Sequence, residues 1–227
     1  GGTVLLTKDR EYNLILFDLD GTVTDSKPGI VNSVKYALKS FGIEEKDEKV
    51  LQSFIGPPLV TSFQKYYGFS DKETAEVIEK YREYYKDKGI YENTLYDGIE
   101  DVIKASFESS KKLVIATAKP TVFAKKVLEH HSLDQYFKKI VGSNLDGTRV
   151  NKDEIIGYIK ESVNSFKTDS TLMIGDRKYD IDSAHQFGID SIGVLYGYGS
   201  ETEIESCNPT FVINTPCEIL EIINVNR

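Results

Sequence analysis

The amino-acid sequence predicts an α/β protein: a parallel sheet covered by helices on both faces, with an all-helical segment inserted after its first strand. Short apolar runs alternate along the chain with segments of helical periodicity. The runs are almost continuously apolar, which is typical of strands buried on both faces. The stretch from about 28 to 93 departs from this alternation, because it contains helical patterns and no good strand.

The first strand is expected at Leu14–Phe17, an unbroken apolar run. Later strands of the same kind are expected at 113–116, 139–141, 172–174, 192–195 and 211–213. Helical patterns lie between and after them at about 98–109, 120–131, 151–164, 179–187 and 215–223. Strands that alternate with helices in this way form a doubly wound, Rossmann-like parallel sheet.

The inserted stretch contains at least three helices. The first has Pro28 at its start and ends at Gly42, and the last begins at Ser70, a residue type that caps helix N-termini. We therefore predict a core domain of residues 1–24 and 96–227 and a helical cap domain of residues 25–95.

Composition excludes several classes of protein. Of the 227 residues, 40% are apolar and 28% are charged, which is too apolar for intrinsic disorder. The net charge of −8 argues against nucleic acid and anionic membranes as partners. No apolar stretch is long enough to span a membrane, and residues 1–8 lack a signal-peptide pattern. Gly1, alone or together with Gly2, is interpreted as a cloning remnant. Because Cys207 and Cys217 are the only cysteines, we expect no disulfide framework and a cytoplasmic location.

Three carboxylates, Asp18, Asp20 and Asp25, follow the first strand within eight residues. Ligands of open α/β sheets bind at the carboxyl ends of the strands. Close carboxylates repel one another unless a cation neutralises them, and oxygen ligands suit Mg²⁺. For any one of these residues, a simple Asp-Gly turn is the rival interpretation.

Polar residues occur again at the same predicted edge. Thr117 ends the second core strand before a helix expected at Pro120, and backbone N–H groups at a helix start can hold an oxyanion. Asp176 and Asp180 follow a later strand, and Lys152 opens the helix at about 151–164. Taken singly, Thr117 could be a turn or cap residue, Asp176 could be the N-cap of the next helix, and Lys152 could be an exposed lysine.

Together, these residues resemble the four motifs of the haloacid dehalogenase (HAD) superfamily. The motifs are Asp18-Leu19-Asp20-Gly21-Thr22, Thr117, Lys152 and Gly175-Asp176-Arg177-Lys178-Tyr179-Asp180. The resemblance runs from about residue 12 to the C-terminus, and the insert is similar to the C1-type cap of that superfamily. Within it, the chain is most similar to the phosphoglycolate-phosphatase-like branch, through residues 54–59 and 188–194.

The resemblance implies a role for each motif residue. Asp18 would be the nucleophile that forms an aspartyl-phosphate, and Asp20 the general acid and base. The Asp18 side chain, the Asp20 main-chain carbonyl and Asp176 would hold Mg²⁺, with Asp180 supporting the metal ligands or Lys152.

Two further sets of residues would bind substrate. Thr117 and the Ala118 N–H would hold phosphoryl oxygens, and Lys152 would neutralise phosphoryl charge and orient Asp18. A cap loop containing Gly56 and Pro57 is the candidate substrate-facing element. Hinges of the cap are expected near 24–27 and 94–98.

The implied function is a Mg²⁺-dependent phosphatase acting on a small phosphorylated metabolite, with 2-phosphoglycolate as first choice. A 5′-nucleotide, pyrophosphate or phosphotyrosine remains open as substrate, as does a monomeric or dimeric state. A phosphotransferase similar to β-phosphoglucomutase is disfavoured, because residues 25–30 lack the histidine usual in that branch. A catalytically idle binding module is disfavoured too, because every motif residue is present.

Two other features have open interpretations. Half of the 14 tyrosines fall in the predicted cap, where packing is favoured over a ligand-stacking wall. They are Tyr36, Tyr66, Tyr67, Tyr81, Tyr84, Tyr85 and Tyr91. Arg177 could contact an anionic substrate or be an exposed residue of a first helical turn.

Overall fold

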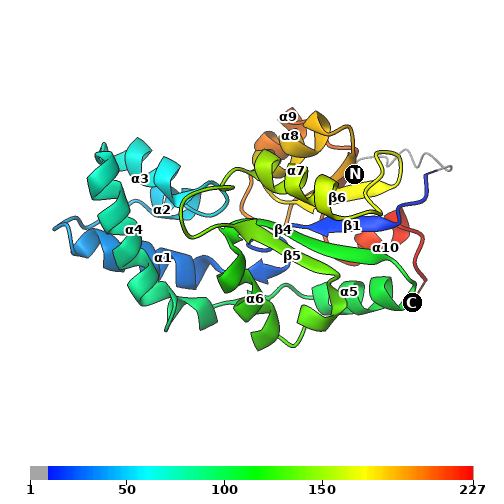
Figure 1. The fold of residues 1–227 in the computed structure, drawn as a ribbon, viewed down its shortest axis with the longest axis horizontal. Helices are drawn as coiled ribbons and strands as arrows, with labels where there is room; N and C mark the ends of the chain where they lie inside the picture. The colour runs from blue at the N-terminus through cyan, green and yellow to red at the C-terminus, as the bar shows by residue number, and fades with distance from the viewer. Residues whose placement is uncertain (1–9, 227) are drawn as a thin grey trace.

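The computed structural model describes residues 10–226, which form a six-stranded, wholly parallel sheet and a group of helices beside it (Figure 1). The strand order is β5-β4-β1-β6-β7-β8. The strands are β1 (Leu14–Phe17), β4 (Lys112–Pro120), β5 (Lys139–Ser143), β6 (Thr171–Gly175), β7 (Asp190–Val194) and β8 (Phe211–Ile213). The predicted α/β fold class is confirmed.

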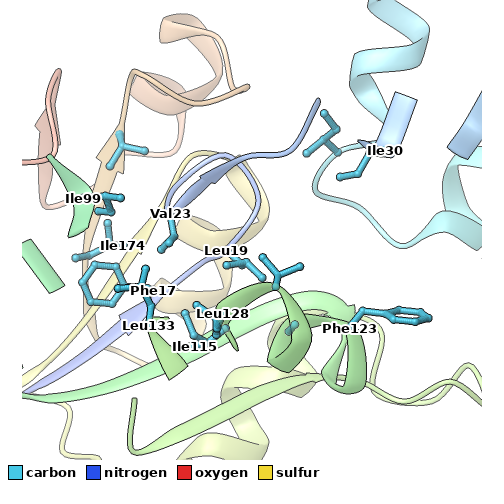
Figure 2. Packing of buried hydrophobic residues seen from close by; sticks show 14 of the residues in the cluster. Phe17, Leu19, Val23, Ile30, Ile99, Ile115, Phe123, Leu128, Leu133 and Ile174 are labelled. Atoms are coloured by element: carbon cyan, nitrogen blue, oxygen red, sulfur yellow. The ribbon is translucent and has the colours of Figure 1, made fainter. Parts of the chain in front are cut away.

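The central strand β1 is buried on both faces, as its apolar sequence predicts. Leu14 and Leu16 belong to one hydrophobic cluster, with Ile155 of the helix α7 (Lys152–Ser162). Ile15 and Phe17 belong to a second cluster on the opposite face. This division follows from the alternation of side chains along a strand. Figure 2 shows part of the second cluster, in which Phe17, Ile115 and Ile174 come from three neighbouring strands.

Helices cover both faces of the sheet (Figure 1). On one side lie α7 (Lys152–Ser162), α8 (Lys178–Gln186) and α9 (Glu201–Ser206); on the other lie α5 (Ile99–Glu108), α6 (Thr121–His130) and α10 (Glu218–Ile222). A short 3₁₀ turn, η2, spans Asp134–Tyr136. Four of these helices lie within the predicted segments, α8 begins one residue before its segment, and α9 was not predicted. Among residues 10–226, no helix is long and apolar enough to cross a membrane.

The inserted helices gather beyond one end of the sheet (Figure 1). They are α1 (Lys27–Lys39), α2 (Glu48–Ser53), α3 (Leu59–Tyr67) and α4 (Asp71–Tyr85), followed by the 3₁₀ turn η1 (Gly89–Tyr91). The start of α4 is fixed as the sequence predicts: Ser70 accepts a hydrogen bond from the Glu73 N–H, and Glu73 accepts one from the Ser70 N–H.

A two-stranded antiparallel ribbon connects these helices to the rest of the chain. It consists of β2 (Thr24–Asp25) and β3 (Thr94–Leu95), which pair Thr24 with Leu95 and Asp25 with Thr94. The ribbon was not predicted, because two-residue strands carry no periodic signal, but it falls within the segments where the hinges were expected. The division into a core (1–24 and 96–227) and a cap (25–95) is used below as a proposal.

Candidate active site

The strand order brings the predicted motifs to one place. β1 pairs with β4 on one side and with β6 on the other, and all three strands run in the same direction. Asp18 directly follows β1, Thr117 lies near the end of β4, and Asp176 directly follows β6. The three side chains therefore meet at the carboxyl edge of the sheet, as strand-end ligands of α/β proteins do.

Lys152, at the first turn of α7, is the buried counter-ion of this edge. Its Nζ lies 3.0 Å from Asp18 Oδ1 and 2.9 Å from Asp180 Oδ1, and it donates a hydrogen bond of 2.8 Å to the Ala116 carbonyl. Burial lowers the pKa of Lys152, but attraction to the two carboxylates outweighs it and the pKa is raised. Lys152 is therefore a permanent cation held against Asp18, not an exposed lysine.

A cluster of buried carboxylates lies beside this lysine. Asp18, Asp176 and Asp180 each bring an oxygen within 4.8 Å of the others. Burial, and next the charge of Asp180, raise the pKa of Asp18 well above its usual range. The same two causes raise the pKa of Asp176 to about 6. Three buried carboxylates with one lysine lack positive charge, so the residues present fit a divalent, oxygen-preferring cation.

Two carboxylates of this cluster, those of Asp176 and Asp180, accept hydrogen bonds from backbone N–H groups. Asp176 Oδ2 accepts a hydrogen bond of 2.9 Å from the Tyr198 N–H, and Asp180 Oδ2 accepts one of 3.1 Å from the Arg177 N–H. Gly21 packs directly against Asp176: its φ is +87°, and a Cβ there would lie 2.0 Å from Asp176 Oδ2. Only glycine allows the loop after β1 to approach this closely.

Thr117 and Ala118 lie on the last part of β4, and the helix expected at Pro120 begins at Thr121 with Pro120 as its N-cap. β4 continues to Pro120, with a shift of register between Ala116 and Pro120, and α6 begins after it. The buried Thr117 hydroxyl accepts a hydrogen bond of 3.1 Å from the Lys119 N–H. Ser143 of β5 donates a hydrogen bond of 2.8 Å to the Ala118 carbonyl. An oxyanion here would therefore meet an irregular strand end instead of a helix N-terminus.

Asp20 carries an unusual carboxylate oxygen. Its Oδ1 is buried and receives no hydrogen bond from any residue between 10 and 226. Lys119 Nζ lies 3.1 Å away, as an ion pair without hydrogen-bond geometry. Lys119 was not among the predicted site residues, although it lies two residues after Thr117 and lines the same cavity. An acid with a free oxygen is suited to exchange a proton with a ligand.

A cavity of about 70 Å³ opens between this edge and the inserted helices. Asp18, Asp20 and Thr117 line it from the core. Gly56 and Pro57, the cap-loop residues expected to face the substrate, line it from the opposite side. Tyr81 and Tyr85 of α4 also line it, stacked on each other with ring centroids 5.6 Å apart. These two tyrosines therefore both pack against each other and line the cavity.

Arg177 is the N-cap of α8 and is partly buried, so it is not the exposed first-turn residue that was one of its two interpretations. Its Nη1 donates a hydrogen bond of 2.5 Å to the Ile55 carbonyl in the cap loop, and its Nε donates one of 2.9 Å to Glu203. The side chain is partly buried, and it does not line the cavity. Arg177 therefore joins the core to the cap loop.

Comparisons with known proteins agree with this geometry. Residues 15–194 match the haloacid dehalogenase-like hydrolase family. The chain is 44% identical over 199 residues to a 5′-nucleotidase from Pseudomonas aeruginosa, which covers 88% of this chain and 90% of the relative. It is 27% identical over 225 residues to a phosphoglycolate phosphatase from Vibrio parahaemolyticus, covering 96% and 98%. The crystal structure of a "predicted phosphatase from Clostridium acetobutylicum" superimposes with a TM-score of 0.91 at 46% identity, covering 94% of this chain and 99% of that one.

Proposed function

The chain belongs to the haloacid dehalogenase-like hydrolase family and is a phosphatase, and we propose that it hydrolyses small phosphate monoesters through a phosphorylated Asp18. Membership confirms the resemblance drawn from the motifs, including the phosphoglycolate-phosphatase-like branch. The observation that carries the proposed mechanism is the pairing of Asp18 with Lys152 at 3.0 Å at the wall of a cavity shared with Asp20.

In the first step, an Asp18 carboxylate oxygen attacks phosphorus while the ester P–O bond breaks. The leaving oxygen takes a proton from Asp20, so a neutral alcohol departs. In the second step, water attacks the aspartyl-phosphate and gives its proton to Asp20, and the bond between phosphorus and Asp18 breaks. Phosphate leaves, and both carboxyl groups return to their first state.

The remaining residues stabilise charge during these steps. Lys152 keeps Asp18 in place and offsets negative charge on the phosphoryl group, while Thr117 and the Ala118 N–H hold phosphoryl oxygens. Asp18, Asp176 and the Asp20 main-chain carbonyl would hold Mg²⁺, with Asp180 supporting Lys152. When bound, Mg²⁺ supplies positive charge to the phosphoryl oxygens.

Two substrate classes have support. The relative from Vibrio parahaemolyticus, aligned over nearly its whole length, favours 2-phosphoglycolate. The relative from Pseudomonas aeruginosa, at 44% identity, favours a 5′-nucleotide. The cytoplasm, where Cys207 and Cys217 stay reduced as the free thiols seen in the structure, is the proposed location.

The test is phosphate release from 2-phosphoglycolate, 5′-nucleotides, pyrophosphate, sugar phosphates and phosphotyrosine, with Mg²⁺ and with chelator. Asp18→Asn is expected to lose nearly all turnover, because an amide cannot act as the nucleophile. Asp169→Asn, an exposed aspartate before β6, serves as the matched control. Wild-type turnover in Asp18→Asn would refute the mechanism.

A further inference from the structure

Two cationic side chains line the otherwise largely apolar cavity above Asp20. Lys119 comes from the end of β4 and Arg82 from α4 of the cap. Their neighbours in the lining include Phe54, Tyr81 and Phe123. Apolar walls reduce the screening of charge, so an anion placed here is attracted more strongly than at an exposed site.

Only some of the hydrogen-bond donors of the Arg82 guanidinium group have partners. Its Nη1 donates a hydrogen bond of 3.1 Å to the Leu145 carbonyl. Its Nε is buried and has no hydrogen-bond partner among residues 10–226. Burial lowers the pKa of Arg82, so the site is costly for the bare cation. Buried donors of this kind are rare in proteins, and a ligand is one group that completes them.

Lys119 is nearly buried, with 7% of its side chain exposed. It contacts the Tyr85 hydroxyl of the cap and lies 3.1 Å from Asp20 Oδ1. The cation thus lies next to the general acid, and its ion pair with Asp20 lacks hydrogen-bond geometry. Because Lys119 belongs to the core while Arg82 belongs to α4, both line one cavity only when α4 lies against the core.

We propose that Arg82 and Lys119 form a second anion subsite, which selects phosphate monoesters whose leaving group carries a carboxylate. This inference rests on the proposed phosphatase function and defines its substrate class. The transferring phosphoryl group already has Asp18, Thr117 and Lys152 at the sheet edge, so the two further cations serve the other end of the substrate. A carboxylate accepts hydrogen bonds from an arginine and a lysine together.

A carboxylate on a small leaving group matches the positive charge of Arg82 and Lys119 in the cavity lining. A nucleoside would bring no negative charge to Arg82 and Lys119. Within this subsite, Lys119 moves from Asp20 to the substrate carboxylate, which leaves Asp20 facing the ester oxygen.

The test compares kcat/KM for 2-phosphoglycolate with kcat/KM for 2-hydroxyethyl phosphate, its neutral analogue of similar length. The wild-type enzyme is expected to prefer the carboxylate by about 10–100-fold or more, the range of a charge-assisted hydrogen bond. Lys119→Met and Arg82→Met are each expected to reduce this ratio about tenfold or more. Lys119→Arg, which keeps the positive charge, should retain most of the preference for the carboxylate substrate.

Lys125→Met, an exposed lysine of α6 outside the cavity, is the matched control and should keep the wild-type ratio. A ratio near one in the wild-type enzyme, or an unchanged ratio in both Met variants, overturns the subsite. Hydrolysis of 4-nitrophenyl phosphate that Asp18→Asn abolishes tests the proposed function separately. If the wild-type enzyme hydrolyses 4-nitrophenyl phosphate but its kcat/KM ratio for the two substrates is near one, only the proposed subsite is wrong. If no compound releases phosphate, the proposed function is wrong and the subsite with it.

Discussion

The charge balance of the acidic cluster of Asp18, Asp176 and Asp180 depends on one residue, Lys152. It is the only lysine or arginine in the described part of the chain that pairs with Asp18 and Asp180, and 5% of its side chain is exposed. Removing one partner of a buried ion pair leaves an uncompensated charge, which costs more than the pair contributes. Its position therefore links the proposed catalytic site to stability at a single side chain.

We predict that Lys152→Met lowers the free energy of unfolding by about 3–5 kcal/mol, because two buried carboxylates lose their counter-ion. Urea denaturation without metal measures the change. Lys160→Met, on an exposed position of the same helix, should stay within about 0.5 kcal/mol of the wild-type protein. Equal unfolding midpoints for the two variants would contradict this explanation.

Sequence alone identified the residues at the strand ends because the position of a strand predicts where its carboxyl end lies. Asp18, Thr117 and Asp176 needed only that rule. Lys119 and Arg82 were missed for different reasons. The strand containing Lys119 is longer than its apolar run, and the position of Arg82 depends on how α4 packs against the core.

Among the elements, the β2–β3 ribbon and the loop after β7 control how the cap is attached. The Tyr198 hydroxyl in that loop donates a hydrogen bond of 2.5 Å to Asp25 of β2 and accepts one of 2.9 Å from the Lys27 N–H. The Tyr198 N–H binds Asp176. One residue thus connects the acidic cluster with the place where the chain enters the cap.

A second connection, made by Arg177, is expected to hold the cap loop against the core. We predict that Arg177→Met accelerates amide hydrogen exchange in α2 and the following loop, because the Ile55 carbonyl loses its donor. Exchange measured by mass spectrometry over 48–58 reports this directly. Lys178→Met, the exposed neighbour, is the control, and equal exchange rates in both variants would show that Arg177 does not hold the loop.

For the whole molecule, the acidic cluster predicts stabilisation by metal. At Mg²⁺ concentrations about 100 times its dissociation constant, binding adds about 2.7 kcal/mol to the free energy of unfolding. In a chain of this size that raises Tm by roughly 5–10 °C. Differential scanning calorimetry with Mg²⁺ and with chelator measures the shift. Asp176→Asn should lose most of it; a shift of the same size in that variant would place the metal elsewhere.

Buried tyrosines predict a loss of stability in alkali. Burial is the first cause that raises the pKa of Tyr81, Tyr85 and Tyr196 above the usual value of 10.0. Above about pH 10 the unfolded chain releases these protons while the folded chain keeps them, so the free energy of unfolding falls as pH rises. The expected slope is about 1.4 kcal/mol per pH unit for each tyrosine.

Urea denaturation between about pH 9 and 11 tests this slope. Tyr81→Phe should make it shallower by about one proton, since Phe carries no titrating group there. A slope that is the same in wild type and Tyr81→Phe would mean that Tyr81 ionises equally in both states.

The order of the chain has a consequence for its synthesis. β1 is the central strand, yet its partners Lys112 and Thr171 come 98 and 157 residues after Leu14. At about 5–20 residues per second, the second partner emerges from the ribosome roughly 8–30 s later. The helices of the insert are local and can assemble meanwhile, but an apolar strand with two unpaired edges stays exposed. We therefore expect nascent chains of this protein to bind chaperones that shield hydrophobic segments.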